Sequence, residues 1–345
     1  MSESPRTPGL PDPGLANPAG PLPAPPFDPQ LAPVLDDIGE LRDAAPASPA
    51  EVPAWRARLG QLAPDPTLEE LRADGAYEVT ERHVPSPEGA PDVPLVIARP
   101  AGLEPGAPVV YHVHGGGMIG GSSRAGLAGL LEEWAVPLGL VVVSVEYRLA
   151  PEHPYPAGVE DCYAGLEWTA RHATEIGGDP ERIVVAGGSA GGGLTCALAL
   201  LARDREGPAI VGQLAMCPML DDRNDTPSAR QLEGRGLWDR RANHVGWSSL
   251  LGEARGTEQV SPYAAPARAR DLSRLAPAFI DVGSAETYRD EAVVYATRIW
   301  QAGGEAELHV WAGGFHGFDQ MAPHARLSQD ARRARLQWLG RILER

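Results

Sequence analysis

The chain has 345 residues, 43% of them hydrophobic, and a formal net charge of -16 at pH 7. A chain of this size can bury one large α/β core plus a smaller appendage, and no apolar run is long enough to cross a bilayer. The acidic surplus argues against nucleic acid and anionic membranes as partners, and the three cysteines, Cys162, Cys196 and Cys217, are expected to be buried thiols without a disulfide framework.

The first 26 residues contain nine prolines and are expected to form an irregular arm. They lack the basic and apolar regions of a secretory signal, so the cytoplasm is the expected compartment.

Residues 27–75 are expected to form helices. Asp28 can cap a first helix that begins with proline, and Ser48-Pro-Ala-Glu51 has the pattern of a capping box for a second. The apolar stripe of the first helix consists of Leu31, Val34, Leu35, Ile38 and Leu41.

Residues 76–220 are expected to form the first part of the core. The buried strand Val109–Val113 runs into His114 and three glycines, Gly115, Gly116 and Gly117. Consecutive glycines can aim several backbone amides into one small space, as stabilisation of an oxyanion requires. We therefore predict the N–H groups of Gly115 and Gly116 as oxyanion donors.

The same loop also fits a different class of protein. Gly115, Gly117 and Gly120 match the dinucleotide fingerprint, and Glu146 follows the next strand, where an acid could hold a ribose hydroxyl. The loop lies late in the chain for a nucleotide-binding domain. An NAD(P)-dependent oxidoreductase is therefore the second interpretation, and it gives Ser189 and His316 no role.

A strand beginning at Val184 breaks into Gly187-Gly-Ser-Ala-Gly191, and a helical apolar pattern follows. A serine at the apex of such a turn is held out of the sheet, and flanking glycines leave room for backbone and substrate. We predict Ser189 as the nucleophile. The amide of Ala190, the next residue, becomes the third oxyanion donor.

Residues 221–265 interrupt the sheet and are expected to complete, with the N-terminal helices, a helical cap over the active site. Their apolar residues are equally suited to a cap core and to substrate contact. The alternative role for the N-terminal helices is a homodimer interface.

The second part of the core is expected in residues 266–345. The strand Ala278–Val282 leads to three acids, Glu286, Asp290 and Glu291. We prefer Glu286 as the partner of a catalytic histidine, because the other two fall where the next helix begins. His316 is the predicted base, since it alone among nine histidines sits in a glycine-flanked loop just after a late strand.

Several motifs together point to a known family. They are His114-Gly-Gly-Gly117, the stretch from Val145 to Ala157, Gly188-Ser-Ala-Gly191, Ser261-Pro-Tyr263 and His316-Gly-Phe318. Over about residues 80–320 the chain resembles the hormone-sensitive-lipase-like esterases, bacterial α/β-hydrolases with an HGGG loop. The resemblance implies an α/β-hydrolase fold, a mostly parallel sheet flanked by helices and covered by a helical cap. It also implies that Tyr147, Arg148, Glu160 and Asp161 brace the oxyanion loop.

The resemblance implies a serine carboxylesterase for short- to medium-chain acyl esters, with Ser189, His316 and an acid, and with no metal or organic cofactor. The family usually has aspartate before proline and leucine at the acid position, whereas this chain reads Glu286-Thr-Tyr. Asp290 therefore stays a competitor. A third class, a non-catalytic ligand-binding relative, typically lacks a triad member, whereas serine, histidine and an acid are all present here.

Overall fold

A computed structural model describes residues 22–39, 45–86 and 89–344. Its strands form one sheet in the order β1-β2-β4-β3-β5-β6-β7-β8. Pairing is antiparallel between β1 and β2 and between β2 and β4, and parallel elsewhere. The strands are β1 (Tyr77–Val84), β2 (Val93–Pro100), β3 (Ala107–Val113), β4 (Val141–Val145), β5 (Gly178–Gly188), β6 (Gly212–Met216), β7 (Ala278–Gly283) and β8 (Ala306–Trp311). The predicted fold class is confirmed.

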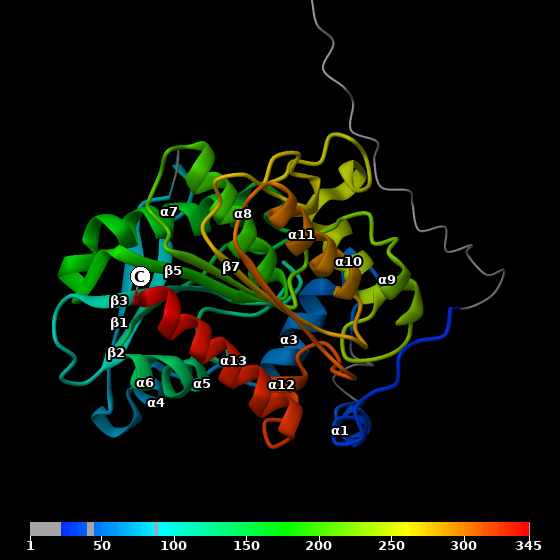
Figure 1. Cartoon of the computed structure of the whole chain (residues 1–345), viewed down its shortest axis with the longest axis horizontal. Coiled ribbons are helices and arrows are strands. Elements are labelled where there is room, and N and C mark those ends of the chain that lie inside the picture. Colours follow the sequence, from blue (N-terminus) through cyan, green and yellow to red (C-terminus); the bar gives the residue numbers. More distant parts are fainter. Residues whose placement is uncertain (1–21, 40–44, 87–88, 345) are drawn as a thin grey trace, which may run out of the picture.

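Helices cover both faces of the sheet, because its central strands are apolar on both sides. On β3, Val109 and Tyr111 belong to one hydrophobic cluster and Val110 to the other. The first face carries α7 (Ala157–His172), α8 (Ala190–Asp204) and α11 (Arg289–Gln301). The opposite face carries α4 (Leu68–Arg72), α5 (Leu127–Leu130), α6 (Val136–Leu138) and α13 (Arg326–Leu343) (Figure 1).

The remaining helices lie near the carboxyl ends of the parallel strands (Figure 1). They are α1 (Ala32–Asp37), α3 (Val52–Leu62), α9 (Pro227–Gln231), α10 (Arg240–Leu251) and α12 (Phe318–Met321). A third hydrophobic cluster joins Leu31 and Leu35 around α1 to Phe315 and Phe318 around α12. The N-terminal segment is thus packed against the loop that carries His316.

The predicted helix cap at Asp28 is wrong. Asp28 forms a turn instead: its Oδ1 accepts from the amide of Gln30 at 2.7 Å, and its own amide donates to the carbonyl of Gly313 at 3.0 Å. These hydrogen bonds hold Asp28 in a turn that is anchored to a distant loop. The helix α1 therefore begins only at Ala32. Most of the predicted arm, and Leu41 of the predicted stripe, lie outside the described residues.

The predicted capping box at Ser48 is wrong as well. The Ser48 hydroxyl donates to the Glu51 carboxylate at 3.0 Å, a 3-10 turn occupies Pro49–Glu51, and α3 begins at Val52. A capping box does occur before α4. There Thr67 Oγ1 accepts from the amide of Glu70 at 3.1 Å, and the Glu70 carboxylate accepts from the amide of Thr67 at 2.7 Å.

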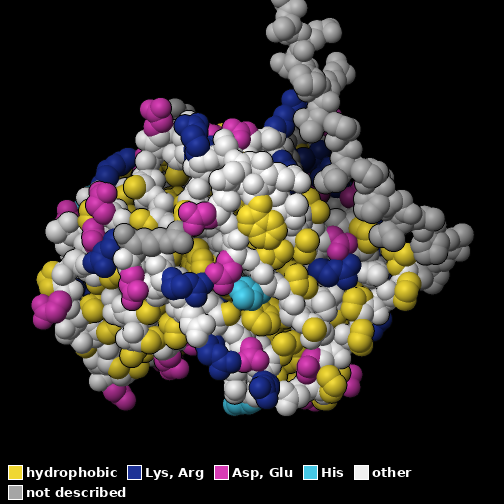
Figure 2. Space-filling model, viewed as in Figure 1, with side chains coloured by type: hydrophobic (Ala, Val, Ile, Leu, Met, Phe, Trp, Pro, Cys, Tyr) yellow, Lys and Arg dark blue, Asp and Glu magenta, His cyan; other side chains and the backbone are white. Residues whose placement is uncertain are grey.

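Figure 2 shows arginine and acidic side chains interspersed over one face of the molecule, with small apolar areas between them. Within the described residues, no helix combines the length and apolar character that a membrane span requires.

Candidate active site

Ser189 lies at a sharp turn between β5 and α8, with φ +58° and ψ -121°. A positive φ is unusual for a residue with a β-carbon, and such strain persists where packing over-determines it. A β-carbon on Gly191 would lie 2.0 Å from the carbonyl oxygen of Val113, and one on Gly187 would lie 2.5 Å from the carbonyl oxygen of Gly191. The turn therefore packs against β3 closely enough to require these glycines.

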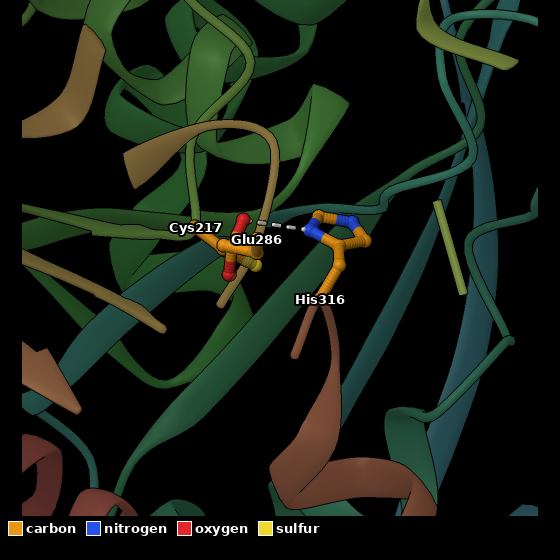
Figure 3. A group of neighbouring side chains, drawn as sticks. All are labelled: Cys217, Glu286 and His316. Carbon is orange, nitrogen blue, oxygen red and sulfur yellow. Dashed lines mark hydrogen bonds and ion pairs between the residues drawn. The ribbon is translucent and has the colours of Figure 1, made fainter. Parts of the chain in front are cut away.

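The structure brings Ser189, His316 and Glu286 together at the ends of β5, β8 and β7. His316 Nε2 lies 3.0 Å from Ser189 Oγ. On the other side of the ring, Nδ1 lies 3.1 Å from Glu286 Oε1, the contact drawn as a dashed line in Figure 3. The other oxygen of Glu286 accepts from the amide of Gly283 at 3.2 Å, and its side chain is only 1% exposed. With Nδ1 donating to the carboxylate, Nε2 is left as the acceptor that faces the serine hydroxyl.

The two competing acids point elsewhere. Asp290 accepts from the amide of Ser228 and from Arg289 Nε, each at 2.7 Å. Glu291 accepts from the amide of Leu220 at 2.8 Å, and burial raises its pKa well above the usual range. Both residues therefore hold other segments in place, while Glu286 is the acid that reaches the imidazole.

The oxyanion loop follows β3, whose ladder ends at Val113. A β-carbon on Gly115 would lie 3.4 Å from Ser189 Cβ, and Gly116 has φ +114°, a region that favours glycine. Ala190 is the first residue of α8, where a backbone N–H has no partner within its helix. Gly115 and Gly116 line the same cavity as Ser189, and Ala190 follows the serine in the chain, so their role as oxyanion donors stays a prediction.

Of the four residues predicted to brace this loop, Tyr147 contacts it directly, while Arg148 and Asp161 pair with each other. Tyr147 stacks on His114 at 4.2 Å and donates its hydroxyl to the His114 carbonyl at 3.0 Å. Arg148 forms a two-pronged ion pair with the buried Asp161, both contacts at 2.7 Å. Glu160 does not join them, because its carboxylate pairs with Arg205.

The dinucleotide interpretation fails in the same loop. Its glycines lead into turns, and the next helix starts only at Leu127. A β-carbon on Gly117 would lie 2.6 Å from the ring of Trp238, and one on Gly120 would lie 2.7 Å from the ring of Trp55, so two of the three fingerprint glycines pack against tryptophan side chains. The Glu146 carboxylate is occupied by the amide and hydroxyl of Ser123, each at 2.7 Å.

A cavity of about 410 Å³ opens beside Ser189. Its walls come from the oxyanion loop, from the N-terminal helix α3, from the segment between α9 and α10, and from the His316 loop. Among the lining residues are Trp55, Leu59, Leu237, Trp238, Met216 and Met321. An apolar cavity that reaches a nucleophile is the usual form of a site for a small organic ligand.

Sequence reasoning missed Cys217, which follows β6 and lines this cavity. It was expected to be a buried thiol, but it is only partly buried and has φ +38°. Its sulfur belongs to a group of three potential metal ligands with Glu286 and His316, whose ligand atoms lie within 4.8 Å of one another. A lone cysteine after a strand has no spacing pattern that could have signalled this position.

Charge around His316 tunes its proton affinity. Burial lowers the pKa of His316, whereas Cys217 and Glu286 beside the ring raise it, and the net shift is upward. Burial raises the pKa of the Cys217 thiol. Two further histidines, His112 and His114, line the cavity, and burial lowers the pKa of both, that of His112 to about 3. They remain neutral near pH 7.

A family model described as alpha/beta hydrolase fold matches residues 110–320. Carboxylesterase NlhH of Mycobacterium tuberculosis is 37% identical over 302 residues, 86% of this chain and 90% of that protein. Esterase LipI of the same species is 34% identical, over 89% and 91% of the two chains. Among solved structures, a bacterial heroin esterase superimposes with TM-score 0.82 at 35% identity, covering 92% of this chain and 98% of that one.

The chain belongs to the α/β-hydrolase family, as the fold, the family match and these identities show. The resemblance to hormone-sensitive-lipase-like esterases is confirmed by the same findings.

Proposed function

We propose that this protein is a serine carboxylesterase that hydrolyses short- to medium-chain acyl esters through an acyl-serine intermediate. The observation that carries the proposal is the chain of hydrogen bonds from Ser189 through His316 to Glu286, at 3.0 and 3.1 Å. The broader statement, that the chain is a carboxylic ester hydrolase, rests on its curated relatives at 34–37% identity.

The mechanism follows from the donor and acceptor atoms. His316 Nε2 takes the proton of Ser189 Oγ as the oxygen attacks the ester carbonyl. The amides of Gly115, Gly116 and Ala190 stabilise the oxyanion. His316 then gives its proton to the leaving alcohol, which leaves an acyl-serine. Water, deprotonated by the same nitrogen, releases the carboxylic acid and restores the serine.

Glu286 acts on the ring rather than on substrate. Its carboxylate fixes the tautomer with hydrogen on Nδ1 and stabilises the imidazolium that forms during attack. The bond from the amide of Gly283 holds the carboxylate in place, so the ring does not have to reorganise during the reaction.

The cavity supports the choice of substrate class. Its volume of about 410 Å³ suits a small organic molecule, and the two tryptophans Trp55 and Trp238 at its walls favour an apolar acyl or alcohol group.

The test is turnover of p-nitrophenyl esters of increasing chain length by the wild type and by Ser189→Ala. We expect a loss of at least about 10⁴-fold in kcat for the variant on every ester. A p-nitrophenyl phosphonate should transfer its phosphonyl group to the wild type with release of p-nitrophenol, and it should not modify Ser189→Ala. A wild-type protein that turns over no ester in the series would favour the ligand-binding alternative.

A further inference from the structure

The side chains of Cys217, Glu286 and His316 converge on the Nδ1 side of the His316 ring. The opposite nitrogen, Nε2, faces Ser189. Figure 3 shows the Cys217 sulfur beside the Glu286 carboxylate and the carboxylate bonded to His316 Nδ1. All pairs among the ligand atoms lie within 4.8 Å. Tetrahedral zinc, with bonds of about 2.0–2.3 Å, holds its ligand atoms about 3.4–3.6 Å apart, so small side-chain rotations would close the set.

The surroundings favour a cation over a neutral molecule. Cys217 and Glu286 share a hollow of about 10 Å³ with Asp281, Asp319 and Arg335. Three carboxylates and one guanidinium leave a formal excess of negative charge at this spot. His316 does not line this hollow, which therefore borders the three ligand atoms on the side of Cys217 and Glu286 and places negative charge next to them.

We propose that Cys217, Glu286 and His316 form an inhibitory site for thiophilic divalent cations, of which Zn²⁺ is the physiological representative. A thiolate, an imidazole nitrogen and a carboxylate oxygen are a donor set that zinc and cadmium accept, whereas calcium and magnesium select oxygen ligands. Within the described residues, no other group of three such ligands occurs. The ion reaches the site from the cavity, which Cys217 and His316 both line.

A metal ion on one ring nitrogen of His316 inhibits catalysis by changing which nitrogen carries the hydrogen. This inhibitory effect rests on the proposed function of His316 as the base. The metal takes the lone pair of Nδ1, which breaks the hydrogen bond to Glu286. A neutral imidazole bound through Nδ1 carries its hydrogen on Nε2, so the nitrogen that faces Ser189 becomes a donor and cannot accept the serine proton. The Cys217 thiol releases its proton to solvent as the metal–sulfur bond forms.

The first test measures inhibition. The esterase rate is titrated with Zn²⁺ in chelator-free buffer for the wild type, Cys217→Ser and Cys196→Ser, each normalised to its own metal-free rate. We expect reversible inhibition of the wild type, relieved by EDTA, and weakening of roughly tenfold or more in Cys217→Ser. Cys196, a fully buried thiol in α8, is the matched control, and its variant should be inhibited like the wild type. Calcium and magnesium should not inhibit.

The second test measures binding without activity. Cd²⁺ is added to the inactive Ser189→Ala variant, and the thiolate-to-cadmium absorption in the ultraviolet is recorded. We expect a saturable band with one metal per chain, and its loss in the double variant Ser189→Ala/Cys217→Ser. A band that survives loss of Cys217, or equal zinc inhibition of wild type and Cys217→Ser, would overturn the site. Cadmium binding without zinc inhibition of the wild type would overturn the inhibitory role, and this outcome is distinct from absence of esterase activity.

Discussion

At the scale of single residues, the contact between the Glu286 carboxylate and the His316 imidazole tests the proposed chemistry. In Glu286→Gln, an amide replaces the carboxylate that lies 3.1 Å from His316 Nδ1, and its NH₂ group can present a donor where an acceptor is needed. The ring can then adopt the wrong tautomer, and we expect kcat to fall by about 10³–10⁴-fold. The measurement is kcat for p-nitrophenyl butyrate.

The same variant should change the pH profile. The Glu286 carboxylate is one of the groups that raise the pKa of His316, so its removal lowers that pKa. The neutral ring is the active form, and activity is lost as pH falls through the pKa. The acid limb of the profile should therefore move to lower pH while its maximum falls.

Asp290→Asn is the matched control for Glu286→Gln. Asp290 bonds to Ser228 and Arg289 and not to the imidazole, so its variant should keep nearly wild-type kcat. It should lose about 1–2 kcal/mol of unfolding free energy with the charged hydrogen bonds. A larger loss of kcat in Asp290→Asn than in Glu286→Gln would contradict the assignment of the acid.

Among elements, the tightest junction is the one between β3, β5 and α8. Gly191→Ala would place a β-carbon 2.0 Å from the carbonyl oxygen of Val113 and 2.7 Å from that of His114, and both contacts are with backbone atoms that cannot rotate away. We expect a loss of at least about 3 kcal/mol of unfolding free energy, or failure to fold. Gly60→Ala in α3 is the control, because its β-carbon meets nothing within 4 Å. There we expect a gain of about 0.5–1 kcal/mol, and urea unfolding of both variants checks the pair.

The segment between α9 and α10, which belongs to the predicted cap, should set the length of acyl chain that fits. The Trp238 ring lines the cavity and approaches Gly117 of the oxyanion loop. Trp238→Ala enlarges the cavity, so longer chains should gain contact area at about 0.8 kcal/mol for each newly buried methylene. We expect the ratio of kcat/KM for octanoate over acetate esters to rise several-fold. An unchanged ratio would mean that Trp238 packs the cap without limiting the substrate.

Motifs located the loops of this site well, and they located helix starts poorly. Ser189, Glu286 and His316 each follow a parallel strand, and glycine patterns mark such strand ends because close backbone packing demands them. Asp28 and Ser48 also had the right local pattern for caps. The amide of Asp28 donates to the distant Gly313, and the Ser48 hydroxyl donates to the Glu51 carboxylate where a capping box needs it to accept from the Glu51 amide. Local pattern cannot predict such competition.

At the scale of the whole molecule, many ion pairs are exposed and add little stability, whereas the cluster around Arg335 is buried. Arg335 of α13 donates through Nε to Asp281 of β7 at 2.8 Å and through Nη1 to Asp319 of α12. The Arg335 side chain is only 6% exposed. This residue therefore ties the last helix to the sheet and to the segment just after His316. An arginine in an amphipathic helix gives no sequence sign of burial, so the cluster could not be predicted.

Replacement of Arg335 should lower the free energy of unfolding far more than replacement of the exposed Arg333 on the same helix. Arg335→Met leaves the buried carboxylates of Asp281 and Asp319 without their cation, which we expect to cost about 3–5 kcal/mol of unfolding free energy at pH 7. Arg333 is 62% exposed and pairs with Asp330 on the same helix. Arg333→Met should cost no more than about 0.5 kcal/mol.

The pH dependence of the Arg335→Met deficit separates lost charge pairing from lost packing. Burial already raises the pKa of Asp281, and Arg335 opposes that rise. Without the guanidinium, both carboxylates should have folded-state pKa values above those of the unfolded chain, so the folded variant binds more protons than its unfolded form. Its unfolding free energy should then rise relative to the wild type as pH falls from neutral toward the carboxyl range. Denaturant unfolding at several pH values measures this difference, and a deficit that stays constant with pH would mean that Arg335 acts through its packing alone.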